Sequence, residues 1–137
     1  MMVEYKVNAP VSSVQFIELL QQTTLGERRP IDDAVIIQGM LDNSDLVVSA
    51  WEGETLVGIA RSVTDFYYCC YLSDLAVSEN IQAKGVGKKL IIETFKQLKS
   101  GCKMNLLAAP LAVEYYPHIG FNRHESAWIL SDLSQLR

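Results

Sequence analysis

The stretch "NIQAKGVGKK" at residues 80–89 carries two glycines one residue apart, between an apolar run and an amphipathic segment. The run before it, "CCYLSDLAV" at 69–77, reads as a buried strand, and the segment after it has helical spacing. Glycine costs a helix about 1 kcal/mol relative to alanine, so two glycines at a helix start need a physical reason. A helix N-terminus exposes unpaired N–H groups and a positive dipole end, and glycine allows an anion to approach the backbone closely. The stretch therefore predicts a diphosphate-binding loop, and a helix start without a ligand is the alternative.

Two other phosphate-binding motifs are excluded by the same residues. A P-loop requires G-x-x-x-x-G-K-[ST], but Gln82 stands where the first glycine belongs and Lys89 replaces the hydroxyl residue. The dinucleotide fingerprint requires a third glycine where Leu90 stands. The loop is therefore of another kind.

The elements around the loop predict a mixed α/β fold. Three strands in succession, at 45–53, 54–66 and 67–77, favour an antiparallel meander. A helix through about Lys99 and a strand at 103–109 then imply one parallel crossover. The other expected elements are a strand at 3–7, a helix capped by Ser12 or Ser13, a helix capped by Asp32 or Asp33, a helical segment before Pro117 and a last strand at 128–133. No repeat or linker interrupts this order, so we expect a single domain over residues 1–137.

Composition and charge limit the class of protein. Of the 137 residues 49% are hydrophobic and 20% charged, which is typical of a globular domain. Residues 1–65 hold ten acidic and four basic residues, whereas residues 84–103 hold Lys84, Lys88, Lys89, Lys96, Lys99 and Lys103 against the single acidic residue Glu93. This local excess indicates an anion site or a solvated helix face. A pI near 5.1 argues against nucleic-acid binding.

Location and metal content are also predicted. No apolar run approaches the ~20 residues that span a bilayer, and "MMVEYKVNAP" lacks the pattern of a secretory leader. An odd set of three cysteines, Cys69, Cys70 and Cys102, indicates free thiols, so we expect a reducing, cytoplasmic location. His118 and His124 do not have metal-ligand spacing, and we expect no metal.

Two motifs together resemble those of the GNAT superfamily of N-acetyltransferases. In "LAVSENIQAKGVGKKL", Gln82 to Gly87 is similar to that family's acetyl-CoA signature, [QR]-x-x-G-x-[GA], which follows a strand and a loop. "EYYPHIGF" at 114–121 resembles its second element, F-Y-x-x-x-G-F. The resemblance covers about residues 68–121, and the two motifs in this order are more specific than either alone.

The resemblance implies a fold, a co-substrate and a reaction. The fold is a mixed, mostly antiparallel sheet flanked by helices, with a splayed central parallel pair of strands. The expected reaction transfers the acetyl group of acetyl-CoA directly to an amine of a small molecule or peptide, with Tyr116 as the acid that protonates the thiolate. Tyr116 as a packing residue is the alternative. Acetyl-CoA would contact Leu75, Ala76 and Val77 through its pantetheine arm, and Gln82, Ala83, Lys84, Gly85, Val86, Gly87 and Lys88 through its diphosphate. Homodimers are common in this superfamily.

The general base departs from the family pattern. Relatives often carry a glutamate on the strand before the loop, whereas strand alternation places Tyr71 and Ser73 on the face shared with Leu75 and Val77. Asp74 should face the opposite side. We expect a water held by Tyr71 or Ser73 to accept the amine proton, unless the amine arrives neutral.

The acceptor site is less defined. Arg28 and Arg29 lie in the connection that commonly contributes to the acceptor site in this superfamily, and arginine binds carboxylates in a bidentate manner. A solvated or internally paired loop is the alternative. Two further functional alternatives remain, a non-catalytic acyl-CoA-binding sensor and an interaction module whose glycines only start a helix.

Overall fold

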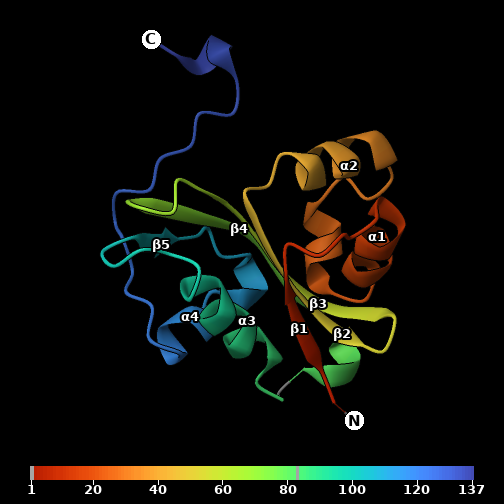
Figure 1. Cartoon of the computed structure of the whole chain (residues 1–137). Helices are drawn as coiled ribbons and strands as arrows, with labels where there is room; N and C mark the ends of the chain where they lie inside the picture. The colour runs from red at the N-terminus through yellow and green to blue at the C-terminus, as the bar shows by residue number, and fades with distance from the viewer. Residues whose placement is uncertain (1, 83) are drawn as a thin grey trace.

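The computed structural model describes residues 2–82 and 84–137. Its centre is a five-stranded sheet in which the strands follow one another in chain order (Figure 1). The first four strands are antiparallel, and only the last pair is parallel. The strands are β1 (Glu4–Val7), β2 (Leu46–Glu52), β3 (Thr55–Thr64), β4 (Cys69–Val77) and β5 (Lys103–Asn105). The predicted mixed, mostly antiparallel fold is confirmed.

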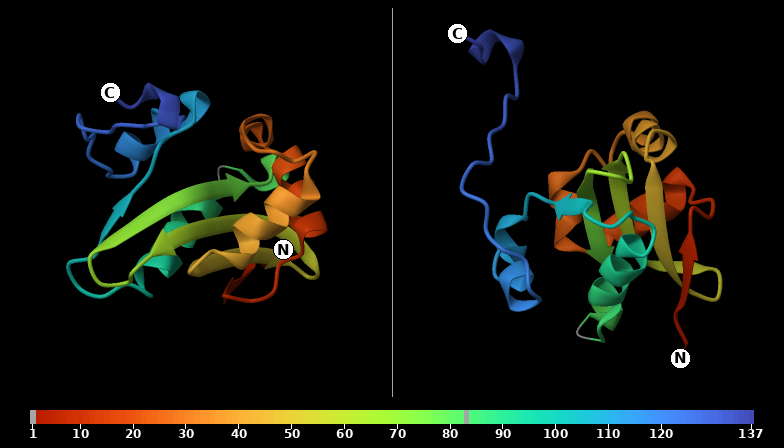
Figure 2. Two further views of the ribbon diagram at one scale, coloured as in Figure 1. Left: turned by 90° about the horizontal axis from the view of Figure 1, so that it is seen from above. Right: turned by 60° about the vertical axis from the view of Figure 1, so that its left-hand side comes forward.

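Helices cover both faces of the sheet (Figures 1 and 2). Two helices, α1 (Ser13–Gln21) and α2 (Ala34–Asp42), bury Phe16 and Ile37 against one face. The helix α3 (Val86–Phe95) packs Leu90 on the other face. The shorter elements are η1 (Thr24–Arg28), η2 (Glu79–Ile81), η3 (Pro110–Ala112), α4 (Tyr115–His118) and η4 (Leu133–Gln135).

The three longer helices begin in two different ways. Ser12 caps α1 in a reciprocal capping box with Gln15, and the Asp33 carboxylate accepts from the first N–H groups of α2. The N-cap of α3 is Gly85, which adopts a left-handed backbone with φ of 77°, and no described side chain caps it. The first N–H groups of α3 are therefore left for another partner.

The parallel strands separate after a short paired segment. Residues 69–71 of β4 pair with residues 103–105 of β5, and β4 then continues to Val77 without a partner on that side among the described residues. The predicted splayed pair is confirmed, although it lies at the edge of the described sheet and not at its centre. Two boundaries differ from prediction, because α3 ends at Phe95 in a tight turn and β5 ends at Asn105.

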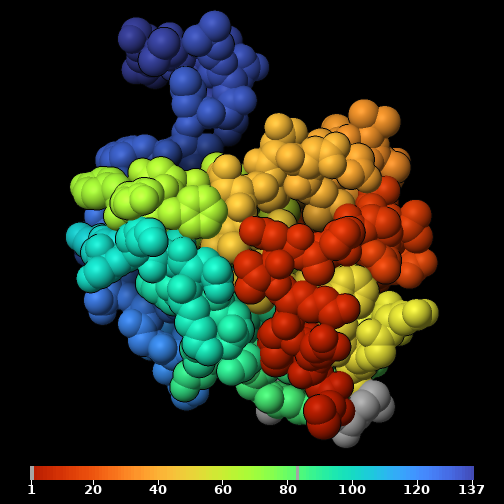
Figure 3. All heavy atoms as spheres, in the orientation of Figure 1, coloured from red at the N-terminus to blue at the C-terminus, as the bar shows by residue number. Residues whose placement is uncertain are grey.

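The predicted strand at 128–133 is wrong. Residues 122–137 leave the body as an extended tail, and the space-filling view shows the tail standing clear of the remaining molecule (Figures 1, 2 and 3). Only the short turn η4 forms in it. A strand requires a neighbouring strand to pair its backbone groups, and no strand of the described sheet pairs with the tail.

Three simpler findings complete the fold. None of the helices in residues 2–82 and 84–137 is long and apolar enough to cross a membrane. All three cysteines are unpaired, as predicted. In the described part of the chain, no three His, Cys, Asp or Glu side chains gather as metal ligands would, and the expected absence of a metal stays a prediction.

Candidate functional site

The glycine loop places the start of α3 beside the end of β4. A Cβ added at Gly85 would meet nothing within 4 Å, so glycine is favoured there by the left-handed backbone and not by crowding. The Gln82 side chain donates to the carbonyl oxygen of Val77 at 3.1 Å, which ties the loop to the strand end. Open space, uncapped N–H groups and the helix dipole are together the features that favour the binding of an anion. The predicted Ala83 lies outside the described residues.

Gly87 is required for a different reason. A Cβ at this position would lie 2.9 Å from the hydroxyl oxygen of Tyr115 and 3.7 Å from Cγ2 of Val77. The two motifs of the sequence therefore touch one another, although 27 residues separate Gly87 from Tyr115. The contact fixes α4 beside the beginning of α3.

Two of the four lysines near the α3 start and along the helix are available for an anion. Lys89 lies 3.1 Å and Lys96 lies 2.9 Å from the same carboxylate oxygen of Glu93. These ion pairs hold the pKa of Glu93 below its ordinary value. Within residues 2–82 and 84–137, Lys84 and Lys88 make no ion pair, and both are exposed. Positive charge at the α3 start is therefore carried chiefly by Lys84 and Lys88.

A cleft opens where β4 and β5 separate. It has a volume of about 140 Å³ and leads from the glycine loop, through Gln82, to the aromatic segment at α4. Its lining combines the end of β4, the segment after β5 and part of η1, and it includes Leu75, Ala76, Val77, Leu106, Ala109, Thr23, Thr24, Leu25, Arg29, Ser73 and Tyr116. No described carboxylate lines it. A larger open depression of about 550 Å³ lies between the start of α1 and α2, and neither glycine-loop nor α4 residues contribute to it.

Tyr116 is a titratable side chain that lines this cleft. Burial raises the pKa of Tyr116 to about 12, with a smaller contribution from Tyr115, so the phenol is protonated at physiological pH. Its ring packs edge-to-face on Tyr115 and on Phe121, with centroids 5.3 and 5.4 Å away. A rigid, protonated phenol is suited to donate a hydrogen bond or a proton.

The predicted placement of Tyr71 is wrong, because β4 contains a bulge. Arg61 pairs with Asp74 and the next residue of β3 pairs with Leu72, which leaves Ser73 as the extra residue. The bulge shifts the alternation by one position, so Leu72 and Leu75 both pack toward α3. Tyr71 is half-exposed on the opposite face and does not line the cleft, whereas Ser73 does.

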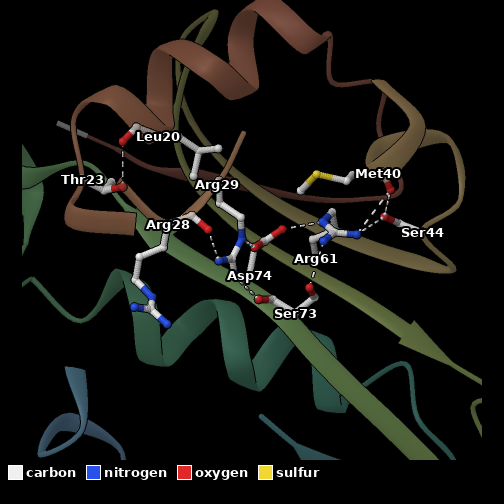
Figure 4. A network of polar contacts seen from close by, with 9 residues as sticks. All are labelled: Leu20, Thr23, Arg28, Arg29, Met40, Ser44, Arg61, Ser73 and Asp74. Carbon is white, nitrogen blue, oxygen red and sulfur yellow. Dashed lines mark hydrogen bonds and ion pairs between the residues drawn. The ribbon is translucent and has the colours of Figure 1, made fainter. Parts of the chain in front are cut away.

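A buried ionic network supports the bulge from behind (Figure 4). The Asp74 carboxylate accepts hydrogen bonds from the Nε groups of Arg29 and Arg61, one on each oxygen. Arg29 also donates to the carbonyl oxygen of Ser73 at 2.8 Å, and Arg61 donates to the Ser73 hydroxyl at 2.9 Å. Arg61 further reaches the Ser44 hydroxyl at 3.1 Å, which connects the network to the end of α2.

Sequence reasoning missed this network. Its signal is a charged residue inside each of two neighbouring apolar strands, Arg61 in β3 and Asp74 in β4. A buried charge requires an opposite partner, so the two residues were candidates for a pair. The register of the bulged strand, which the sequence does not reveal, brings them together.

The two predicted acceptor-site arginines have different surroundings. The Arg29 guanidinium is occupied by Asp74, the Ser73 carbonyl and the Arg28 carbonyl. The Arg28 side chain makes no hydrogen bond or ion pair with the described residues and points away from the network (Figure 4). Only Arg28 therefore has a guanidinium that is available to a carboxylate from outside.

Comparisons with known proteins agree with this arrangement. Residues 28–129 match the family described as "Acetyltransferase (GNAT) domain". The chain is 30% identical over 100 residues to the uncharacterized N-acetyltransferase ycf52 of Gracilaria tenuistipitata var. liui, an alignment that covers 69% of this chain and 53% of that protein. The chain spans about half the length of the curated relatives that it matches.

Solved structures share the fold. A GNAT-family acetyltransferase from Streptococcus pneumoniae TIGR4 superposes with a TM-score of 0.72 at 23% identity, covering 96% of this chain and all of the other. An aminoglycoside N-acetyltransferase in complex with CoA gives the same TM-score at 16% identity, covering 96% of this chain and 95% of the other. At this identity the likeness concerns the fold alone.

Proposed function

The chain belongs to the GNAT acetyltransferase family, and on this premise we propose that it transfers the acetyl group of acetyl-CoA to an amine of a small molecule or peptide. One observation carries the proposal. The unpaired edge of β4 and Tyr116 line one cleft, and Gln82, which lines the same cleft, lies in the loop that leads to the uncapped start of α3. A diphosphate requires an anion site, and an amide-bearing arm can pair with a free strand edge. A thioester that is to release a thiolate requires a proton donor.

The residues present fit acetyl-CoA. The space around Gly85 and the free N–H groups of α3 would receive the diphosphate, with Lys84 and Lys88 adding charge. The open edge beside Leu75 and Val77 would pair with the pantetheine amides. Acetyl-CoA, when bound, supplies an acyl group on a thiolate leaving group.

Two side chains would then act on the reacting atoms, Tyr116 directly and Ser73 through a water. The amine would attack the thioester carbonyl as the free base and lose one proton, and the carbon–sulfur bond would break. The thiolate would receive a proton through Tyr116, whose phenol is restored by the proton that the amine loses. A phenol with a pKa of about 12 is a weak acid toward a thiol of pKa about 8.5, so its main contribution is a hydrogen bond to the developing charge. Ser73 would hold the water that accepts the amine proton, because Ser73 lines the cleft and its hydroxyl is oriented by a hydrogen bond from Arg61.

Arg28 would meet the acceptor. Its guanidinium is uncommitted, whereas that of Arg29 holds Asp74 and shapes β4. We therefore assign acceptor binding to Arg28 and a positioning role to Arg29. An acceptor amine that also bears a carboxylate, such as an amino acid, fits Arg28 best.

The remaining expectations belong to the same proposal. Residues 1–137 would act as one acetyltransferase domain in the cytoplasm, where unpaired thiols are stable, without a metal or a nucleic-acid partner.

A non-catalytic acyl-CoA sensor is the second candidate. The observation that favours it is the lack of a carboxylate among the described residues that line the cleft. Turnover separates the two candidates. Thiol release from acetyl-CoA with a panel of amines, absent in Tyr116→Phe and present in the wild type, would support the enzyme.

Acetyl-CoA binding by calorimetry tests the site itself. Asn and Asp both tolerate a left-handed backbone and have the same shape, so Gly85→Asn and Gly85→Asp differ only in charge. We expect Gly85→Asp to weaken acetyl-CoA binding at least tenfold more than Gly85→Asn, because a carboxylate repels the diphosphate. Equal affinities of the two variants, or no binding to the folded wild type, would remove the diphosphate site.

A further inference from the structure

The cleft carries positive charge beside Ser73. Arg29 lines the cleft and belongs, with Arg61 and Asp74, to the buried network. Two guanidinium groups face one carboxylate in this network, so a net positive charge remains directly behind the bulge. The exposed Arg28, next to Arg29 in the chain, adds a second positive charge (Figure 4).

No described carboxylate inside the cleft balances this charge. The surrounding elements hold Glu27 in η1, Glu79 in η2 and Glu114 at the start of α4, but all three are exposed and none of them lines the cleft. Both oxygens of Asp74 are already taken by the two arginines. Most of the lining residues are leucine, alanine or valine. An ammonium group placed here would lose water without gaining a counter-charge, which is costly.

We propose that the acceptor is an aromatic amine that bears a carboxylate, and not a basic aliphatic amine. In an aromatic amine the ring delocalises the lone pair of the nitrogen, so the amino group is uncharged at neutral pH. The ring matches the apolar lining, and the carboxylate matches the guanidinium of Arg28. An aliphatic amino acid shares the carboxylate but arrives mainly as an ammonium ion. The inference rests on the proposed function and narrows its substrate class.

Such an acceptor also explains how the reaction proceeds in a cleft without a carboxylate base. The nitrogen of the neutral amine forms a bond to the acetyl carbon, and the carbon–sulfur bond breaks. The nitrogen then loses one proton and the thiolate gains one, so the amide and the thiol both leave uncharged. No proton has to be removed before the attack, and a water at Ser73 is therefore a sufficient base.

Two matched compounds test the charge of the acceptor. The compounds para-aminobenzoate and para-(aminomethyl)benzoate share the ring and the carboxylate, but only the second is an ammonium ion at neutral pH. Calorimetry with the CoA-loaded chain measures their binding without acetyl transfer, and thiol release from acetyl-CoA measures their turnover. We expect para-aminobenzoate to bind about tenfold more tightly or better, and to have the higher kcat/KM. Preference for para-(aminomethyl)benzoate in either measurement, or turnover of neither compound, would overturn the inference.

A carboxylate placed in the cleft should reverse the preference. Thr24 is exposed and lines the cleft from η1. The variants Thr24→Glu and Thr24→Gln have nearly the same shape, but only the first offers a counter-charge to an ammonium ion. Repulsion of the carboxylate that both compounds carry cancels in the ratio of their affinities. Relative to Thr24→Gln, we expect Thr24→Glu to shift this ratio about tenfold toward para-(aminomethyl)benzoate. The same ratio in both variants would overturn the inference.

The outcomes separate this inference from the proposed function. Thiol release with aliphatic amines alone would overturn the inference while supporting acetyl transfer. No thiol release with any amine would overturn the proposed function, and the inference with it. Thiol release with para-aminobenzoate, together with the shift in Thr24→Glu, would support both.

Discussion

A methyl group at Gly87 would lie 2.9 Å from the hydroxyl oxygen of Tyr115. This single contact joins the loop proposed to bind the diphosphate to the helical turn that carries Tyr116. A side chain at Gly87 would displace the hydroxyl of Tyr115, the residue next to Tyr116 in the chain. A substitution there should affect the loop and the turn together.

Gly87→Ala should weaken acetyl-CoA binding by about tenfold. Overpacking at a tight contact costs about 1–3 kcal/mol, and relief of the clash would shift α4 or the start of α3. The double variant Gly87→Ala with Tyr115→Phe removes the hydroxyl oxygen and should recover most of the affinity. Calorimetry of both variants checks this. Equal losses in the single and double variants would show that the Tyr115 contact is not the cause.

Asp74→Asn should destabilise the protein strongly, by about 3–5 kcal/mol. The substitution leaves the buried guanidinium of Arg61 without its counter-charge and also releases Arg29. Chemical denaturation measures the free energy of unfolding. The matched control is Glu93→Gln, which removes the exposed ion pairs of α3 and should change stability little. Similar small effects of the two variants would mean that the network contributes nothing to folding.

The high pKa of Tyr116 predicts a pH dependence of stability. The unfolded phenol loses its proton near pH 10, whereas the folded one keeps it to about 12. The contribution of Tyr116 is therefore complete below pH 10 and is lost as the pH rises toward 12. Denaturation of wild type and Tyr116→Phe at pH 8 and pH 11 should show the larger decrease for the wild type. Parallel decreases would place the pKa of Tyr116 near its ordinary value.

The bulge in β4 predicts different roles for its two hydroxyl side chains. Ser73→Ala should lower kcat by about tenfold or more, because Ser73 faces the cleft and would hold the proton-accepting water. Tyr71→Phe should leave kcat unchanged at every pH, because Tyr71 lies on the opposite face. Steady-state rates over a pH series check both. A loss of activity confined to Tyr71→Phe would contradict the assignment.

A lysine near α3 should strengthen acetyl-CoA binding only if it is not already in an ion pair. Lys88→Gln should weaken acetyl-CoA binding about threefold to tenfold at low salt, and less at high salt because the charge is exposed. Lys96→Gln serves as the control. Lys96 lies at the other end of α3 and is paired with Glu93. Equal effects from the two variants would indicate a general charge effect and no defined site.

The sequence-based prediction of the fold needed fewer corrections than the prediction of the site. The order of strands and helices follows from hydrophobic periodicity and turn residues, and the caps at Ser12 and Asp33 were among the predicted candidates. The side of the sheet that Tyr71 faces was mispredicted, because strict alternation fails at a bulge and one inserted residue reverses every later side chain. The strand at 128–133 failed because β-structure requires a partner, which a local sequence does not contain.

The sequence by itself determined that a strand runs through a glycine loop into an amphipathic helix, since short-range periodicity, capping and the left-handed preference of glycine are local properties. Only the tertiary structure decided that Gly87 meets Tyr115, that Asp74 lies between Arg29 and Arg61, and that Arg29 and not Arg28 is held in this network. The physical reason is the same in each case. These contacts join residues from 13 to 45 positions apart, and their geometry depends on strand register and helix packing, which are set by the whole chain at once.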